Sequence, residues 1–235
     1  MLINYDEFVR RADAIQARIV AECKRVGRDP AAVQLLAVTK THPVAAAEFA
    51  ARYGLKRVGE NRVQEGMEKR AQTEVPLLWD LIGHLQSNKS KLAVQFFDRV
   101  QSVDSVKLLT HLDRAATELG KTLPILLQIN AGNDPAKFGA ESEEAPALLE
   151  TALAKAALRV EGLMTIAPLG TTPDETRAHA QRTFNNLREM RDRLAARFRV
   201  PLAELSMGMT GDLEIAVAAG STVVRVGTAL YGARE

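Results

Sequence analysis

The chain has 235 residues, and its 31 lysines and arginines against 29 aspartates and glutamates give a formal net charge of +2. This near balance leaves no broad basic face for a phosphate backbone and argues against nucleic-acid binding. One cysteine and four histidines cannot make an internal disulfide or a multi-thiolate zinc site, so we expect no structural metal and a reducing, cytoplasmic location. Charges interrupt the first twenty positions and no stretch of about 18 apolar residues occurs, so we expect neither a signal peptide nor a membrane span.

The first predicted element is an amphipathic helix within residues 1–30. Apolar residues recur at steps of three and four from Phe8 to Val26, and Gly27 and Pro30 end the pattern. Cys23 lies on this apolar stripe, where a small core side chain is expected.

After this helix, one unit recurs along the chain: a short apolar run, a turn, and a segment with helical spacing. We count eight runs, at residues 34–39, 55–60, 77–83, 99–104, 124–130, 160–167, 204–209 and 222–227. Runs without strict alternation are typical of parallel strands that are buried on both faces. Helical spacing between them is clearest at residues 43–53, 105–119, 143–157, 172–198 and 212–219.

The eightfold repeat predicts an α/β fold, a single (β/α)₈ TIM barrel over residues 34–230 with an additional N-terminal helix, and one domain over residues 1–235. The alternative is a doubly wound open sheet. No Gly-x-Gly-x-x-Gly turn follows a predicted strand, and no linker divides the chain. Too few residues follow the eighth run to form an eighth outer helix, so we expect the N-terminal helix to take that place.

Active-site residues of such barrels come from the carboxyl ends of the strands. Lys40 follows the apolar run Leu35 to Val38. If its amine lies over the barrel mouth, desolvation favours the neutral form, which is a nucleophile able to condense with an aldehyde. The alternative is a solvated lysine beside a strand end.

The loops after the seventh and eighth runs are where barrels usually bind phosphate. The first contains Ser206 to Asp212 and the second contains Gly227 and Thr228, so both combine glycine with hydroxyl donors. Such turns also connect strands and cap helices without binding anything.

Arg225 lies within the eighth run, where a buried guanidinium needs an acceptor. A structural carboxylate could serve, and so could a ring nitrogen of a cofactor. An aldehyde at Lys40, a phosphate at the last two loops and a pyridine nitrogen at Arg225 together describe pyridoxal 5′-phosphate.

At these residues the sequence resembles the pyridoxal phosphate homeostasis proteins, also called YggS-like proteins or proline synthase co-transcribed homologues. These are similar to the isolated barrel domain of alanine racemase, so the resemblance implies a barrel of the alanine racemase N-terminal type. The matching segments are AVTKTHP (37–43), GENRVQE (59–65), IGHLQSNK (82–89), QSVDS (101–105), GLM (162–164), LSMGMTGD (205–212) and GSTVVRVGTALYGAR (220–234).

The resemblance implies a role for each of eight cofactor-binding residues. Lys40 carries the cofactor as a reversible Schiff base, and Arg225 faces the pyridine nitrogen. The phosphate is surrounded by Ser206, Gly227 and Thr228, and the site is lined by Asn61, Met164 and Met207.

The segment at residues 133–134 and the residue His84 are considered separately. Asn133 and Asp134 stand where the family commonly has a glutamate, which puts an acidic role there in doubt. His84 follows the third run, where it could contact the cofactor or orient the turn at residues 86–89.

Racemisation needs a base on each face of the substrate carbon, and alanine racemase takes its second base from a tyrosine of a second domain. We expect no such domain here, and of Tyr5, Tyr53 and Tyr231 only Tyr231 follows a predicted strand, where it is interpreted as a packing residue. The resemblance therefore implies an intracellular pyridoxal phosphate homeostasis protein that keeps amino-acid and keto-acid balance, with no catalytic residue, as a monomer or weak homodimer. Apo forms of pyridoxal-phosphate-dependent enzymes are its expected protein partners. The alternatives are a weakly active amino-acid racemase or lyase that uses the cofactor, and a barrel aldolase.

Overall fold

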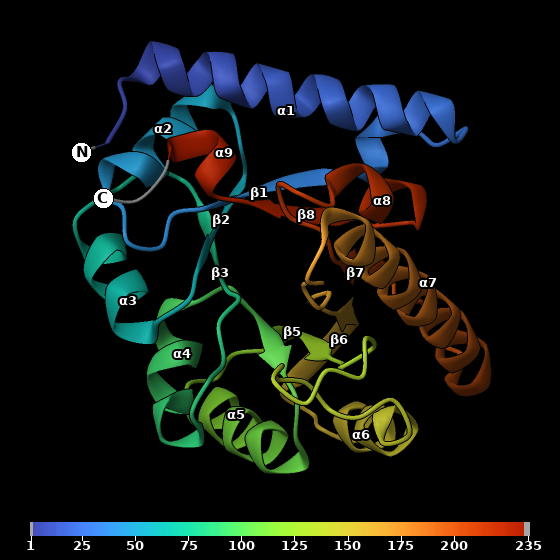
Figure 1. Ribbon diagram of the computed structural model, residues 1–235. Helices are drawn as coiled ribbons and strands as arrows, with labels where there is room; N and C mark the ends of the chain where they lie inside the picture. The colour runs from blue at the N-terminus through green and yellow to red at the C-terminus, as the bar shows by residue number, and fades with distance from the viewer. Residues whose placement is uncertain (1, 233–235) are drawn as a thin grey trace.

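The computed structural model describes residues 2–232 as a closed barrel of parallel strands surrounded by helices (Figure 1). Each strand pairs with the next along the chain, and β8 pairs with β1 to close the barrel. This confirms the predicted (β/α)₈ architecture. The strands are β1 (Gln34–Val38), β2 (Arg57–Glu60), β3 (Leu78–Leu81), β4 (Arg99–Val103), β5 (Leu123–Gln128), β6 (Leu158–Met164), β7 (Glu204–Ser206) and β8 (Val223–Val226).

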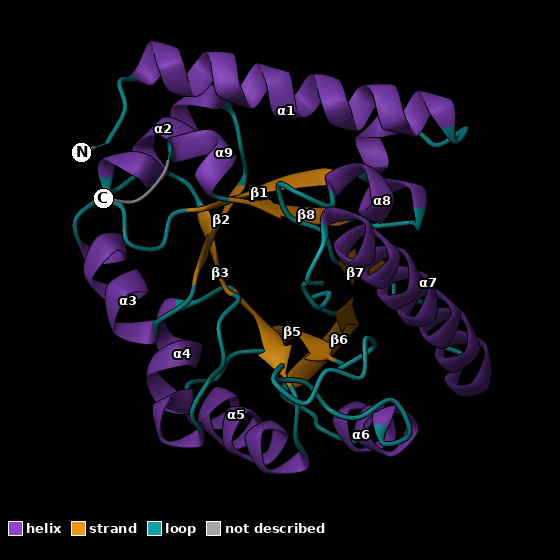
Figure 2. Cartoon of the chain, in the orientation of Figure 1, coloured by secondary structure: helices purple, strands orange, loops and turns teal. Residues whose placement is uncertain are grey.

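Helices follow the strands and form an outer layer, which Figure 2 shows around the ring of strands. They are α1 (Tyr5–Arg25), α2 (Ala45–Tyr53), α3 (Val63–Ala71), α4 (Ser90–Phe96), α5 (Val106–Glu118), α6 (Ala145–Leu153), α7 (Pro173–Phe198), α8 (Leu213–Ala218) and α9 (Thr228–Tyr231), with short 3-10 helices at Pro30–Ala32 and Ser87–Lys89.

The N-terminal helix α1 occupies the expected place in the outer layer. It packs against α8, α9 and α2, next to the junction of β1 with β8 (Figure 1). Asn4 begins the helix by accepting a hydrogen bond from the Glu7 N–H, and the predicted stripe, including Phe8 and Cys23, is buried. Helix α1 therefore completes the ring that the short segment after β8 leaves open.

Two helices lack the apolar pattern that would have predicted them. The buried face of α3 is made by Val63, Gly66 and Lys69. The seven-residue helix α4 buries Ser90, Ala93 and Val94. Small and charged residues on these buried faces gave no hydrophobic periodicity, which is why neither segment was among the clear helical spacings.

The predicted domain covers residues 1–235. The last of the segments that match the family covers residues 220–234. Residues 1 and 233–235 lie outside the described part of the chain. No helix within residues 2–232 is both long and apolar enough to cross a membrane.

Candidate cofactor site

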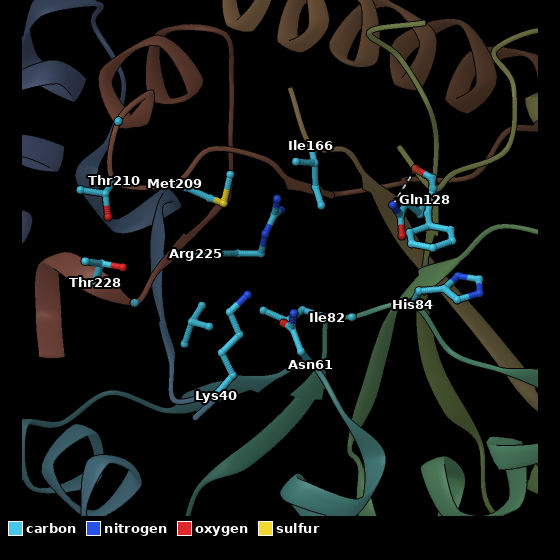
Figure 3. A pocket seen from close by; sticks show the side chains of 15 residues that line it. Lys40, Asn61, Ile82, His84, Gln128, Ile166, Met209, Thr210, Arg225 and Thr228 are labelled. Carbon is cyan, nitrogen blue, oxygen red and sulfur yellow. Dashed lines mark hydrogen bonds between the residues drawn. The ribbon is translucent and has the colours of Figure 1, made fainter. Parts of the chain in front are cut away.

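A cavity of about 580 Å³ opens at the carboxyl ends of the strands, which is the size of a small-molecule site (Figure 3). Apolar side chains and a few polar groups converge on it. Its lining residues are Val38, Lys40, Asn61, Ile82, Gly83, His84, Gln128, Phe138, Ile166, Met209, Thr210, Gly211, Arg225, Gly227 and Thr228.

Lys40 extends from the end of β1 into this cavity, beside Asn61 (Figure 3). The backbone on both sides of it is held by side chains of α3. The Lys69 amine donates to the Thr39 carbonyl over 2.7 Å, and the Thr41 N–H donates to Glu65. Thr41 has φ +66°, a left-handed conformation that a β-branched residue adopts only when its surroundings impose it. These contacts fix the direction in which Lys40 leaves the strand.

A buried charge cluster lies behind Lys40. The Lys69 amine donates to Glu60 Oε1 at 2.8 Å and to Glu65 Oε1 at 2.7 Å, and the Thr39 hydroxyl donates to Glu60 Oε1 at 2.6 Å. Glu60 Oε2 is buried without a hydrogen-bond partner among the described residues. Burial raises the pKa of Glu60, and the hydrogen bond from Lys69 opposes this only in part.

Arg225 extends from β8 and lines the same cavity as Lys40 (Figure 3). Its side chain is buried, and its partners within residues 2–232 are the Ser206 hydroxyl at 2.8 Å and the Thr165 carbonyl at 2.9 Å, not a carboxylate. Burial lowers the pKa of the Arg225 guanidinium to about 10, and the Asp212 carboxylate partly opposes the shift. At neutral pH the cavity therefore contains a fixed cation with further N–H groups to donate.

The loops after β7 and β8 form one end of the cavity. They contribute the hydroxyls of Thr210 and Thr228 and the backbone of Gly211 and Gly227. Gly208 shapes the first loop, since its φ is +93° and a Cβ there would lie 2.3 Å from the Cβ of Ala216. This end can donate several hydrogen bonds to one anionic group.

The opposite side of the cavity is aromatic. Phe138 stacks on His84 with ring centroids 4.0 Å apart and planes 12° apart, and Phe138 is 60% exposed. His84 Nδ1 lies 3.3 Å from Asp104 Oδ2. Phe138 is brought here by the loop between β5 and α6, which is tied to β5 by the bond from Gln128 Nε2 to the Phe138 carbonyl, 2.8 Å (Figure 3). His84 therefore lies at the cavity, rather than only beside the following turn.

Five of the eight predicted binding residues line the cavity: Lys40, Asn61, Arg225, Gly227 and Thr228. The other three, Met164, Ser206 and Met207, are buried and are not among the lining residues. Ser206 instead contacts Arg225 and Gln101 below the cavity floor.

Sequence reasoning passed over Gln128, Ile166 and Phe138 as lining residues. Gln128 ends β5 and is buried, so a polar residue closing an apolar run was the available signal. Ile166 and Phe138 lie on loops, and no periodic pattern shows which loop residues turn inward.

The doubtful acidic position lies away from this cavity. Asn133 and Asp134 line a separate cavity against α7. The Asp134 carboxylate accepts the Ala136 N–H at 2.9 Å, within its own loop. Its acidic group thus stabilises the loop that carries Phe138.

The three tyrosines contact α1 or belong to it, and the cavity lining contains none of them. Tyr231 is buried, stacks on Phe8 with centroids 5.2 Å apart and donates its hydroxyl to the Ala46 carbonyl at 2.9 Å. Burial raises its pKa far above the usual value. The interpretation of Tyr231 as a packing residue is confirmed. Within residues 2–232, no group of three or more histidine, cysteine, aspartate or glutamate side chains is arranged to hold a metal ion.

Comparison with known proteins identifies relatives along the whole chain. The family model of the alanine racemase N-terminal domain matches residues 11–235. The pyridoxal phosphate homeostasis protein of Pseudomonas aeruginosa is 40% identical over 222 residues, which cover 94% of this chain and 93% of that protein. The protein of the same name from Aquifex aeolicus is 36% identical, with 96% and 97% covered.

Solved structures agree with these relatives. PipY of Synechococcus elongatus, a structure with pyridoxal phosphate bound, superposes with a TM-score of 0.78 at 40% identity, and the match covers 93% of this chain and all of PipY. Alanine racemase of Clostridium difficile, at 17% identity and a TM-score of 0.74 over 93% of this chain and 56% of that one, shares the fold. The chain belongs to the pyridoxal phosphate homeostasis proteins, a family built on the alanine racemase N-terminal domain.

Proposed function

We propose that this protein binds pyridoxal 5′-phosphate reversibly in the cavity at the carboxyl ends of the strands and so takes part in cofactor homeostasis and in amino-acid and keto-acid balance. The observation that carries the proposal is the joint placement of Lys40, Arg225 and the donor-rich end at Gly227 and Thr228 around one cavity. The relatives that share the chain's length are named pyridoxal phosphate homeostasis proteins, which supports the cofactor and the homeostasis part of the proposal.

The residues present fit the cofactor part by part. Lys40 would bond covalently and reversibly to the aldehyde carbon, and Arg225 would donate to the pyridine nitrogen. Thr210, Gly211, Gly227 and Thr228 would donate to the phosphate, with Asn61 beside the ring. Met164, Ser206 and Met207 would act from beneath the cavity floor, Ser206 through its bond to Arg225.

Pyridoxal phosphate supplies an aldehyde that condenses with amines. It also supplies a ring that can accept electrons from the carbon next to the bound amine nitrogen. Arg225 would limit the ability of the ring to accept electrons in this site. A guanidinium with a pKa of about 10 has no acid proton to give to the ring nitrogen at neutral pH, so the nitrogen would remain an unprotonated acceptor and the ring a weak electron sink. Among the described residues, the cavity lining also contains no tyrosine that could act as the second base of a racemase, and the two features together favour storage and release of the cofactor over catalysis.

The same proposal includes the location of the protein, its oligomeric state and its partners. A cytoplasmic chain over residues 1–235 that forms one domain, as a monomer or weak homodimer, would exchange its cofactor with apo forms of pyridoxal-phosphate-dependent enzymes. The net charge of +2 supports protein and small-molecule partners over nucleic acid.

Absorption spectroscopy of the purified protein tests the proposal. Addition of pyridoxal phosphate should produce a visible band that borohydride removes, and mass spectrometry should then locate the reduced adduct on Lys40. The Lys40→Ala variant should lose the band, whereas Lys107→Ala, on the exposed face of α5, should keep it. A wild-type protein that takes up no cofactor, or a Lys40→Ala variant with full uptake and a full band, would contradict the assignment.

A weakly active racemase or lyase is the second candidate, because His84, paired with Asp104, lines the same cavity as Lys40. A second proton-transferring group is what racemisation would require. Sustained turnover of a small amino acid that is abolished by Lys40→Ala and by His84→Ala would favour this candidate.

A further inference from the structure

A row of polar side chains crosses the interior of the barrel below the cavity. Gln101 on β4 donates from Nε2 to Asp80 Oδ2 at 2.6 Å, and its Oε1 accepts the Ser206 hydroxyl at 2.6 Å. Ser206 in turn accepts from Arg225 at 2.8 Å. All four side chains are buried. Since β4 and β7 are not neighbours in the barrel, the bond between Gln101 and Ser206 spans its interior.

Asp80, at the end of the row farthest from the cavity, determines which group donates and which accepts in every hydrogen bond of the row. Asp80 receives Arg57 at 2.9 Å and Arg99 at 2.7 Å, so it is held as a carboxylate and can only accept. Gln101 must therefore turn its amide NH₂ to Asp80 and its carbonyl to Ser206. The single Ser206 proton goes to that carbonyl, which leaves the serine lone pairs for Arg225.

Arg225 is thereby held by two acceptors from different strands. Ser206 accepts from Nη1, and the Thr165 carbonyl, just after β6, accepts from Nη2. Neither acceptor is charged, so these two bonds fix the plane of the guanidinium without neutralising it. The position of the guanidinium therefore depends on the row of side chains beneath it.

We propose that Gln101 is a positioning residue for cofactor binding: by fixing the Ser206 proton, it holds the Arg225 guanidinium in the plane that meets the ring nitrogen of pyridoxal phosphate. The inference rests on the proposed function and adds a residue that makes no contact with the cavity. It also gives Ser206 a role as the link between Gln101 and Arg225, in place of the phosphate contact that the resemblance implies.

Gln101→Leu removes the acceptor for the Ser206 proton and keeps a buried side chain of roughly similar volume. The Ser206 hydroxyl is then able to turn toward another acceptor, and Arg225 loses its defined partner. We expect the dissociation constant for pyridoxal phosphate to rise by about fivefold to tenfold, the loss of one positioning hydrogen bond, with a shifted absorption maximum of the bound cofactor.

Ser206→Ala breaks the same row with a smaller change and provides a second variant if Gln101→Leu folds poorly. Because both substitutions interrupt one path, their effects on the dissociation constant should not add: the double variant should bind about as weakly as either single variant. Val100→Ala, the neighbour of Gln101 on β4 that packs in the hydrophobic core, is the matched control. It should lower the thermal stability of the apo protein and leave cofactor affinity and spectrum unchanged.

Titration of the four variants and the wild type with pyridoxal phosphate, alongside thermal unfolding of each apo protein, separates the outcomes. Weaker binding and a shifted spectrum in Gln101→Leu and Ser206→Ala, with no additivity, support the inference. Wild-type affinity and spectrum in both variants, or additive losses that follow only the loss of apo stability, would overturn it while the proposed function stands. A wild type that binds no cofactor would overturn both.

Discussion

Glu60 is a carboxyl group buried behind Lys40. Its Oε1 accepts two hydrogen bonds, one from the Lys69 amine and one from the Thr39 hydroxyl, while its Oε2 is buried without a partner among the described residues. Its pKa is raised, chiefly by burial. The folded state therefore holds this proton more tightly than the unfolded chain does.

This shift predicts how stability changes with pH. The contribution of Glu60 is complete below its unfolded pKa of about 4.3 and is lost as the pH rises through the raised folded value. Relative to wild type, Glu60→Gln should therefore gain unfolding free energy as the pH is raised from 4 to 8. Urea unfolding of both proteins across this range measures the difference. A difference that stays constant with pH would show that Glu60 keeps its ordinary pKa in the folded protein.

Lys69 is the cation on which this cluster depends. Lys69→Met leaves Glu60 and Glu65 without their shared partner and releases the Thr39 carbonyl beside Lys40. We expect a loss of roughly 3 kcal/mol in unfolding free energy, as for other broken buried ion pairs, together with weaker cofactor uptake. Lys91→Met removes an exposed pair with Glu118 and should cost at most about 1 kcal/mol. Equal losses in the two variants, measured by chemical denaturation, would contradict a structural role for the cluster.

At single positions, the sequence was most informative where a residue broke its local pattern. Lys40 after an apolar run and Arg225 inside one were both found in this way, and both line the cavity. Ser206 is buried at the end of β7 and is not among the lining residues, and the pattern of a short strand does not show which side its last residue faces. Gln101 showed the same kind of signal, a polar residue within a buried strand, but its partners lie on β3 and β7 and no local pattern identifies them.

The loop between β5 and α6 is the element that closes the aromatic side of the cavity. Asn130 N–H bonds to the Ala140 carbonyl and Ala140 N–H to the Gln128 carbonyl, both at 2.9 Å, so the loop returns to the strand it leaves. Gly139 permits this return with φ +133°, where a Cβ would lie 2.7 Å from the Asn130 nitrogen. Phe138 is held over His84 as a result.

Phe138→Ala tests whether this loop retains the cofactor. The stacking of Phe138 on His84 stabilises the position of the loop over the cavity by about 0.5–1.5 kcal/mol, so its loss should accelerate cofactor release by roughly twofold to tenfold. Apo stability should change little because Phe138 is exposed. Leu169→Ala, on the next loop and also exposed, is the control and should release cofactor at the wild-type rate. Stopped-flow transfer to an apo enzyme in excess measures both, and equal rates in all three proteins would show that Phe138 does not cover the site.

Helix α1 takes the place in the outer layer that the count of eight repeats predicted for it. It also contacts the loop after β7 that lines the cavity. Arg18 binds Glu214 on α8 through two bonds of 2.6 and 2.9 Å and donates to the Thr210 carbonyl at 3.1 Å. Helices α3 and α4, in contrast, were missed because tertiary packing supports them without an apolar stripe. An element was predictable when its own sequence carried the pattern, and not when its neighbours supplied the stability.

Phe8→Ala examines whether α1 is part of the barrel's cooperative unit. Phe8 is fully buried and packs on Tyr231 and Tyr53, so its truncation should cost about 3–5 kcal/mol. Unfolding should remain a single transition, with fluorescence and circular dichroism giving the same midpoint. Lys24→Ala, an exposed residue of the same helix, should leave the midpoint unchanged. Separate transitions for the two probes in Phe8→Ala would show that α1 docks onto an independently stable barrel.

For the whole molecule, the eightfold repeat was sufficient to predict the barrel, because strand count and parallel order leave few closed arrangements. The path of polar groups through the interior was not predictable in the same way. Arg57, Asp80 and Arg99 lie on three adjacent strands near the amino end of the barrel, and their grouping depends on the register between strands. In a closed sheet, the strands and outer helices can thus be predicted from sequence periodicity. The contacts between polar side chains inside the barrel cannot, because they depend on the register between strands.

The pairing of β1 with β8, in which Leu36 lies opposite Arg225, also determines when the site can exist during synthesis. Lys40 emerges from the ribosome long before Arg225, Gly227 and Thr228, so this is a contact of high sequence separation that closes late in folding. A chain ending at Ala219 has the lysine but neither the guanidinium nor the last donors. We expect such a chain, released or held as a nascent chain, to show no visible band with pyridoxal phosphate, so that cofactor capture reports closure of the barrel by β8.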